Sequence, residues 1–405
     1  MKNNNPPLPT ISDEFQMADA AEDAFANGQV LNVAGPPGSG KTETVDQAID
    51  ELNDRLLAEG IIKERMRVLY KNHTSALPEG VCGFTMPHED GINSRFLRPP
   101  ELPFASDGDE HVVILLDELD KYDETVKGSL LSLVNPVKCA DGKARPRLGG
   151  HVLSANTYII ATSNRVSDAS GGTRLGNALL TRSANYEFLP RADVFCRIMR
   201  ESTDMINGKP LATSAGIMFV DFESRNDKNL ISDPVPNPPP GEAYNTPRTL
   251  ENACRSCVRL EDQPERLAKA LSATLGHKRG EQMFAFVSLV KDLLPKLATI
   301  RENGDYKLSE DPQERYALLH CAVRVALKEI TPEKHEDMTE KEIKDARLTA
   351  VAGGGIDWLI DMALAQDGEL CTFLGNFAEQ VGVPISQHPE GPAVKGAKDA
   401  ADKKS

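Results

Sequence analysis

The chain has no long apolar run, no excess of basic residues and no even set of cysteines. Its most apolar run, VVILL at residues 112–116, is far too short to cross a bilayer. The formal net charge is −15 at pH 7, whereas a protein that binds nucleic acid along its whole surface is usually basic. We therefore expect no membrane span, and the charge disfavours nucleic acid as a partner outside a local patch.

The seven cysteines are an odd, widely scattered set. Such a set indicates reduced thiols rather than a disulfide framework. Cys254 and Cys257 form one CxxC pair, but neither a second pair nor a nearby histidine completes a zinc site, so we interpret them as ordinary helix residues. The N-terminus, MKNNNPPLPT, has no apolar signal core. We expect a soluble cytoplasmic protein, located in the host cytoplasm if the source is viral.

The expected elements divide the chain into an α/β half and a helical half. With 405 residues the chain is too long for one simple core. The strand-like segments MRVLY, HVVILLDE and TYIIATSN precede residue 190, and helical patterns recur later at 261–275, 281–299, 312–330 and 356–381. The expected parts are a disordered leader at 1–11, an α/β core at 12–230, a proline-rich linker at 231–247, an all-helical part at 248–386 and a disordered tail at 387–405.

A glycine-rich turn follows the strand-like segment QVLNVA and opens an amphipathic helix. The turn, GPPGSGKT at residues 35–42, matches GxxxxGK[ST], and its place between a strand and a helix makes this a strong signal for a phosphate-binding loop. Its glycines let backbone N–H groups face phosphate oxygens, and the helix N-terminus adds partial positive charge. We expect Lys41 to reach the β- and γ-phosphates and the Thr42 hydroxyl to hold Mg²⁺. The residues expected to hold the nucleotide are Gly35, Pro36, Pro37, Gly38, Ser39, Gly40, Lys41, Thr42 and Glu43.

Two carboxylates end the strand expected in HVVILLDELDKYDE. The continuous apolar run is typical of a parallel strand buried on both faces, and its C-terminal end should share a sheet edge with the phosphate loop. We expect Asp117 to hold Mg²⁺ through water, and Glu118, pointing the other way along the strand, to polarise an attacking water. A nucleotide kinase does not need this second acid, and the NKxD motif of a G-protein is missing, so the pair favours hydrolysis. We interpret Asp120 and Asp123 as solvated acids at a helix start.

A third strand, TYIIATSN, is predicted to end at Asn164. A carboxamide at the end of a neighbouring strand can orient the same water or touch the γ-phosphate. An asparagine after a strand is by itself usually a turn former. Its position after a phosphate loop and an acidic pair favours a functional role.

The order of GPPGSGKT, ILLDELD, TYIIATSN, NALLTR and NTPRTLEN resembles that of the AAA+ ATPases. The resemblance is closest to their MoxR-like branch, which shares features with dynein-type modules, and it runs from about residue 20 to about residue 300. It implies a P-loop parallel sheet sandwiched by helices, followed by a helical lid and a C-terminal helical extension. It also implies ATP and Mg²⁺ as cofactors. The sequence departs from the family's pattern after about residue 300.

The resemblance also implies roles for two arginines. Arg182, after NALLT, stands at the family's arginine finger, which reaches into the nucleotide of a neighbouring subunit. Arg174 and Arg197 are rival candidates for that role. Arg248, in TPR, stands at the second sensor arginine of the lid and is expected to contact the γ-phosphate. Because the finger comes from a neighbour, the resemblance implies a homo-oligomeric ring, most often a hexamer.

Three functions remain open from the sequence. The leading interpretation is a chaperone-like, ATP-driven remodeller of a protein client, and proteins of this family often work with a separate protein that carries a von Willebrand A domain. The second is a nucleic-acid motor, for which the basic stretch KARPRLGG at residues 143–150 is the candidate contact. The third is an ATP-gated scaffold with little turnover, which an intact Glu118 disfavours.

Overall fold

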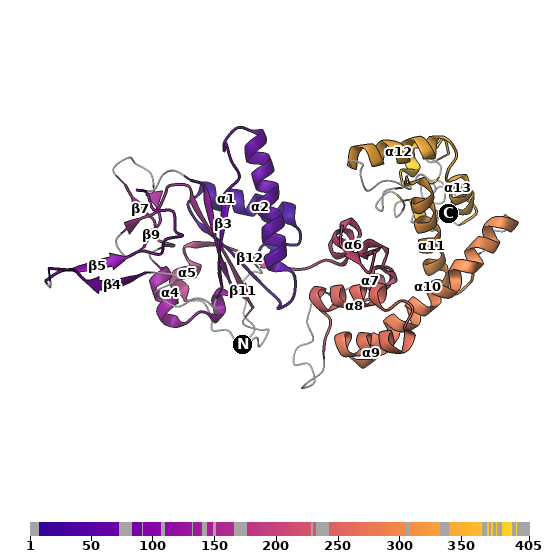
Figure 1. The fold of residues 1–405 in the computed structure, drawn as a ribbon, viewed down its shortest axis with the longest axis horizontal. Coiled ribbons are helices and arrows are strands. Elements are labelled where there is room, and N and C mark those ends of the chain that lie inside the picture. The colour runs from indigo at the N-terminus through magenta and orange to yellow at the C-terminus, as the bar shows by residue number, and fades with distance from the viewer. Residues whose placement is uncertain are drawn as a thin grey trace. The chain divides into compact units, whose positions relative to one another are not determined.

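The computed structural model of the chain divides into two compact units (Figure 1). The first contains Met1–Val194, Ile231–Pro239 and Asn245–Arg248, and the second contains Phe195–Leu230, Pro240–Tyr244 and Thr249–Ser405. The structure describes residues 8–72, 83–90, 92–106, 110–131, 133–139, 144–148, 151–165, 176–227, 230–231, 243–304, 306, 308–332, 340–366, 371, 374–375, 378, 383–390 and 394.

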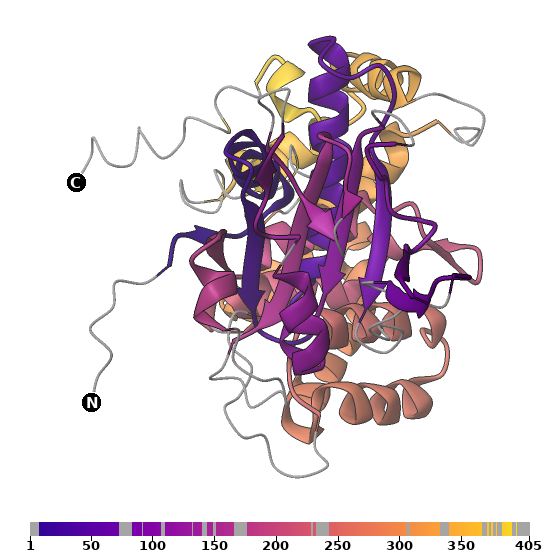
Figure 2. The ribbon, with the colours of Figure 1, turned by 90° about the vertical axis from the view of Figure 1, so that its left-hand side faces the viewer.

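A six-stranded parallel sheet forms the centre of the first unit (Figure 2), and its strands follow the order β1-β12-β2-β11-β6-β3. In the register, Asn164 is opposite Gly35, and Ala161 is opposite Leu116. The C-terminal ends of β2, β11 and β6 therefore meet at one edge of the sheet, as expected for the motif-bearing strands. The strands are β1 (Thr10–Ile11), β2 (Val30–Gly35), β3 (Arg67–Asn72), β6 (Val112–Asp117), β11 (Thr157–Asn164) and β12 (Ser183–Phe188).

Helices cover both faces of this sheet, so the α/β class predicted from the sequence is confirmed (Figure 1). Along β6, Val112, Ile114 and Leu116 join one apolar core, while Val113 and Leu115 join the other. The first core also takes side chains from α4 and α5, and the second from α1 and α2. A strand with apolar residues at every position is thus buried on both sides. The helices are α1 (Glu14–Ala26), α2 (Lys41–Ala58), α4 (Glu124–Leu130) and α5 (Asn177–Leu180).

The end of the expected leader is ordered, which corrects the prediction of disorder for residues 10–11. Thr10 and Ile11 form β1, which pairs in parallel with β12. The Ile11 side chain is buried at 1% exposure, and its carbonyl accepts a hydrogen bond from Leu189 N. One buried apolar side chain and a strand edge thus order a segment too short to show a period in the sequence. Residues 1–7 lie outside the described part of the chain.

Short antiparallel ribbons precede β6 and β11. One is formed by β4 and β5, and the others pair β7 with β8 and β9 with β10. The ring of His151 contacts the rings of Phe96 and Phe104, which joins the base of the first ribbon to β10. The strands are β4 (Phe84–Pro87), β5 (Ser94–Leu97), β7 (Val137–Lys138), β8 (Ala144–Arg145), β9 (Arg147–Leu148) and β10 (His151–Val152).

The second unit is mainly helical, as predicted for the C-terminal half. In the described part of the chain, no helix is long and apolar enough to cross a membrane. The helices are α6 (Ala192–Glu201), α7 (Ala215–Asn226), α8 (Pro247–Arg259), α9 (Pro264–Leu275), α10 (His277–Asn303), α11 (Pro312–Ile330), α12 (Glu340–Ala352) and α13 (Asp357–Leu364), with a short ribbon of β13 (Met205–Ile206) and β14 (Lys209–Pro210).

Two helices that the sequence analysis assigned to the α/β core at 12–230 fall in the helical unit. The division comes after Val194, so α7 and most of α6 belong to the second unit. The ring of Phe219 on α7 packs edge-on against Phe286 of α10, with centroids 5.8 Å apart. Buried aromatic contacts of this kind hold α7 to the later helices. The sequence offered no composition shift at residue 195 to mark this division.

The CxxC cysteines are core residues of α8, in agreement with their interpretation as ordinary helix residues. Cys254 and Cys257 are 0% and 4% exposed. Burial raises the pKa of Cys257 to about 12 and that of Cys254 well above its usual range, and buried neutral thiols are unreactive. Among the described residues, no group of three or more His, Cys, Asp or Glu side chains could hold a metal ion.

The start of the expected tail is also ordered, which corrects the prediction of disorder at 387–390. Gln387 ends a short 3₁₀ helix, and His388 Nε2 lies 2.8 Å from Asp357 Oδ1 at the start of α13. Val394 is fully buried. The other tail residues, and residues 232–242 of the expected linker, lie outside the described part of the chain.

Candidate active site

The phosphate loop has the backbone that its glycines allow. Gly38 and Gly40 have φ angles of 69° and 89°, in the left-handed region that other residues avoid. At Gly35 an added Cβ would lie 2.8 Å from Phe188 O, so β12 leaves room only for glycine there. Gly40 is the N-cap of α2 and brings no side chain to the first N–H groups of the helix. These N–H groups and the helix dipole form an anion-binding site.

Lys41 lies inside this loop and is buried at 9% exposure. Its Nζ donates to Gly35 O at 2.9 Å and Pro36 O at 2.8 Å, and it lies 3.4 Å from Asn164 Oδ1. The contact with Asn164 exists because β11 is the direct neighbour of β2. A cation and a carboxamide, predicted independently from two distant segments, are therefore side by side at the phosphate loop.

Oxygen ligands suited to Mg²⁺ gather beside the loop. Thr42 Oγ1 donates to Asp117 Oδ1 at 2.9 Å, so the first helical turn of α2 contacts the end of β6. Thr162 Oγ1 on β11 donates to the same carboxylate oxygen at 2.5 Å and accepts from Glu118 N at 3.1 Å. A hydroxyl and a carboxylate are the hard oxygen donors that Mg²⁺ prefers, with water and phosphate filling its other positions. Thr42 and Asp117 therefore fit a magnesium site.

The sequence analysis expected Glu118 to continue the strand, and the structure corrects this expectation. β6 ends at Asp117, and Glu118 has a φ of 53°. This left-handed conformation is uncommon for a residue with a side chain, and it is often found at functional sites. It turns the chain away from the sheet into a short 3₁₀ helix, Leu119–Lys121. Lys121 Nζ lies 2.5 Å from Glu118 Oε1, so this ammonium competes with water for the carboxylate.

The structure corrects the interpretation of Asp120 as a solvated acid. Asp120 is buried at 5% exposure, and its carboxylate accepts from Asn164 N at 3.0 Å and from Asn164 Nδ2 at 3.2 Å. Asp123, in contrast, is exposed and accepts from Thr125 N at 2.8 Å at the start of α4, as expected of a helix-start acid. The physical reason is the turn at Glu118, which carries Asp120 toward β11.

Sequence reasoning missed three residues of this site: Asp120, Thr162 and Lys121. Thr162 carried a usable signal, because it is two residues before Asn164 on the same strand and so shares its face of the sheet. For Asp120 and Lys121 no such signal existed. Their positions depend on a left-handed residue that a sequence pattern does not reveal.

The structure places the three described arginine candidates differently. Arg182 follows α5 and is exposed, and its Nη1 donates to Ala178 O at 2.7 Å. Arg197 forms an ion pair with Glu201 within α6, at 3.3 Å. Arg248 is exposed, and its backbone N donates to Gly38 O at 3.2 Å, a contact within the first unit that holds Arg248 beside the phosphate loop. Arg174 lies outside the described residues.

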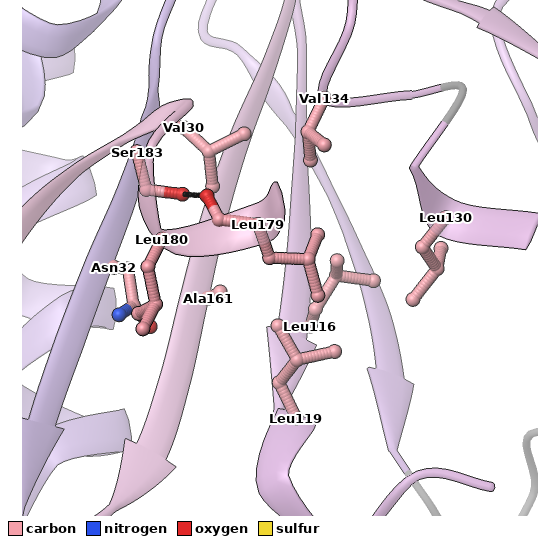
Figure 3. A pocket seen from close by; sticks show the side chains of 10 residues that line it. All are labelled: Val30, Asn32, Leu116, Leu119, Leu130, Val134, Ala161, Leu179, Leu180 and Ser183. Atoms are coloured by element: carbon pink, nitrogen blue, oxygen red, sulfur yellow. Dashed lines mark hydrogen bonds between the residues drawn. The ribbon is translucent and has the colours of Figure 1, made fainter. Parts of the chain in front are cut away.

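A small apolar pocket lies under α5 (Figure 3). Leu179 and Leu180 of α5 face the side chains of β2, β6 and β11, and Ser183 Oγ donates to Leu179 O at 2.8 Å. Asn32 is the only amide among the residues that line the pocket, and no lining residue has an acidic or basic side chain. The pocket offers no group for catalysis, so the candidate site remains the polar edge of the sheet.

No protein-family model matches the sequence, and no curated protein matches it. Among solved structures, the chain is similar to a RuvB mutant from Thermotoga maritima, with a TM-score of 0.30 and 12% identity, covering 83% of this chain and 86% of that one. It is also similar to the ORC2 protein of Aeropyrum pernix in its ADP form, with a TM-score of 0.33 and 11% identity, covering 87% and 88%. TM-scores this low carry no argument, so the fold class rests on the strand order and the helices described above.

Proposed function

We propose that this chain is an AAA+ ATPase of the MoxR-like branch, which hydrolyses ATP with Mg²⁺ in a homo-oligomeric ring and remodels or activates a protein client. The observation that carries the proposal is the meeting of three motifs at one sheet edge, where Lys41 lies 3.4 Å from Asn164 and Thr42 lies 2.9 Å from Asp117. The order of motifs along the sequence, which resembles that family, is its second support.

Each residue at this edge has a role in the proposed reaction. The loop from Gly35 to Gly40 holds the phosphates through backbone N–H groups, and Lys41 turns its ammonium from the loop carbonyls to the β- and γ-phosphates. Thr42 and Asp117 would hold Mg²⁺, which would supply positive charge to offset that of the phosphate oxygens. Glu118 accepts a proton from the attacking water.

The remaining roles belong to Asn164 and two arginines. Asn164 orients the attacking water or contacts the γ-phosphate. Arg182 is the arginine finger for a neighbouring subunit, because its guanidinium is exposed and bonds only locally to Ala178 among the described residues. Arg248 senses the γ-phosphate, and its backbone bond to Gly38 holds it beside the phosphate loop within the first unit. Most AAA+ rings are hexamers, so six subunits is the proposed number, and a protein with a von Willebrand A domain is the proposed type of client.

Phosphate release measured against protein concentration tests this function. We expect Mg²⁺-dependent ATP hydrolysis whose specific activity rises with concentration, because an active site completed in trans exists only in the assembled ring. Chelation of Mg²⁺ should abolish the activity. Hydrolysis that is independent of protein concentration would contradict the ring, and no hydrolysis at any concentration would contradict the enzyme.

A nucleic-acid motor is the second candidate, supported by one basic surface. Arg145 and Arg147 lie on β8 and β9, in the basic stretch KARPRLGG, and the one acid in the sequence of residues 133–153, Asp141, lies outside the described residues. If this surface binds single-stranded DNA, affinity should fall by about tenfold or more between 50 mM and 200 mM salt for a few phosphate contacts, and Arg145→Glu/Arg147→Glu should remove binding. If the protein does not bind single-stranded DNA at low salt, the remodelling of a protein client remains the proposed function.

A further inference from the structure

We propose that Asp120 is a positioning residue that fixes the orientation of the Asn164 carboxamide for ATP hydrolysis. This inference rests on the proposed function and assigns a role to a residue that the motifs do not include. The Asp120 carboxylate contacts Asn164 at two points, accepting from the backbone N at 3.0 Å and from Nδ2 at 3.2 Å. Both residues are buried, at 5% and 8% exposure, so water does not compete freely for these bonds.

These contacts allow only one orientation of the Asn164 amide. With Nδ2 donating to Asp120, the amide oxygen Oδ1 faces Lys41 Nζ at 3.4 Å. In a flipped amide, the oxygen would face the Asp120 carboxylate, so that two acceptors would meet. Its NH₂ group would face the Lys41 ammonium, so that two donors would meet. Asp120 therefore determines which end of the carboxamide meets the phosphate end of the site.

The fold holds Asp120 in this place from both sides. The left-handed turn at Glu118 directs the chain into the 3₁₀ helix Leu119–Lys121, where Leu119 is anchored in the apolar core at 4% exposure. Lys127 of α4 donates from Nζ to Asp120 O at 3.0 Å. Asp120 is thus part of a rigid turn, which is what a positioning residue requires.

A second bond joins β11 to the chain just before Asp120, at Glu118. Thr162 accepts from Glu118 N at 3.1 Å, and Asn164, two residues further along β11, bonds to Asp120. β11 therefore contacts the chain immediately before and after the Glu118 side chain. These bonds hold the backbone of Glu118 and the Asn164 amide at fixed places on one stretch of β11, which is the arrangement that two groups acting on one attacking water require.

The test compares Asp120→Asn with Asp123→Asn, the same chemical change at an exposed acid three residues away. The substituted carboxamide would offer an NH₂ where Asn164 needs an acceptor. We expect kcat for ATP hydrolysis, measured at saturating ATP, to fall by about 10- to 100-fold in Asp120→Asn, as for a misplaced catalytic group. Asp123→Asn should keep the wild-type kcat. An unchanged kcat in Asp120→Asn would overturn the inference.

A double-mutant cycle separates positioning from a general structural role. If Asp120 acts through Asn164, then adding Asp120→Asn to Asn164→Ala should leave kcat at the Asn164→Ala value. Losses that multiply instead would overturn the inference. If Asp120→Asn does not fold, as judged by its melting temperature, Asp120→Ser goes through the same cycle, since it removes the carboxylate without adding an NH₂ group.

If the proposed function itself is wrong, the experiment shows this by a separate result. A wild type that releases no more phosphate than Glu118→Gln is not an ATPase, whatever the role of Asp120. In that case the ratio of the Kd values for ADP and ATP replaces kcat as the readout. Asp120→Asn and Asn164→Ala should then lower this ratio equally, and an unchanged ratio in Asp120→Asn would overturn the inference.

Discussion

Glu118→Gln should lower the rate of phosphate release by about 100-fold or more while ATP still binds, since a general base contributes about 10²–10⁴ in rate. Glutamine has nearly the size and shape of glutamate, so the turn at φ 53° should persist. It cannot accept a proton from the attacking water, and it loses the ion pair with Lys121. Phosphate release at saturating ATP, together with the Kd for ATP, measures both parts of this expectation.

The matched control is Glu124→Gln. Glu124 also pairs with a lysine three residues later, Lys127, at 3.1 Å, but its side chain is 75% exposed and it is outside the site. We expect this variant to hydrolyse ATP at the wild-type rate. If the wild type and Glu118→Gln release phosphate equally slowly, the ATPase proposal fails, and an ATP-gated scaffold becomes the better interpretation of the same nucleotide site.

Arg182→Ala should have an effect of similar or greater size, because an arginine finger contributes about 10³–10⁵ in kcat. The guanidinium is exposed at the end of α5, and its described hydrogen bond is to Ala178 O within the same helical turn. Its removal should therefore leave the fold and ATP binding nearly unchanged. Arg191→Ala, which removes an exposed arginine paired with Asp193, is the control and should keep full activity.

A mixing experiment shows whether Arg182 acts across a subunit interface. Arg182→Ala and Lys41→Ala should each be inactive, the first for lack of a finger and the second for lack of a phosphate-binding ammonium. In an equimolar mixture, some sites combine an intact loop from one subunit with an intact finger from its neighbour, so part of the activity should return. If the mixture stays inactive and Arg197→Ala instead abolishes hydrolysis, the finger is Arg197, and the release of its ion pair with Glu201 becomes part of the mechanism.

Local sequence features predicted elements of both units, a strand of the α/β core and a helix of the helical part. The apolar run VVILL predicted a strand buried on both faces, because every one of its residues is apolar, and Val112–Asp117 is that strand. The helix expected at 312–330 matches α11, whose N-cap Asp311 and first-turn Pro312 are strong start signals. These predictions succeeded because their information lies within one short segment.

The positions that sequence reasoning missed depend on contacts between distant segments. Ile11 is ordered by a strand edge much later in the chain, where it lies opposite Phe188. Asp120 is buried where the turn at Glu118 carries it to Asn164, 44 residues away, from which it accepts hydrogen bonds. The start of the helical unit at Phe195 is set by packing of α7 on α10. Neither hydrophobic periodicity nor a motif reports such contacts.

The left-handed backbone of Glu118 implies that the stability of the fold and the proposed catalytic activity place opposite demands on this one residue. For a residue with a Cβ this conformation costs about 1–2 kcal/mol, which glycine does not incur. Glu118→Gly would thus relax the turn while removing the carboxylate. If Glu118 is the general base of the proposed reaction, selection for thermal stability alone would favour glycine at this position, and selection for hydrolysis would retain glutamate. Searches for stabilised variants of this protein therefore need an activity screen beside the thermal one.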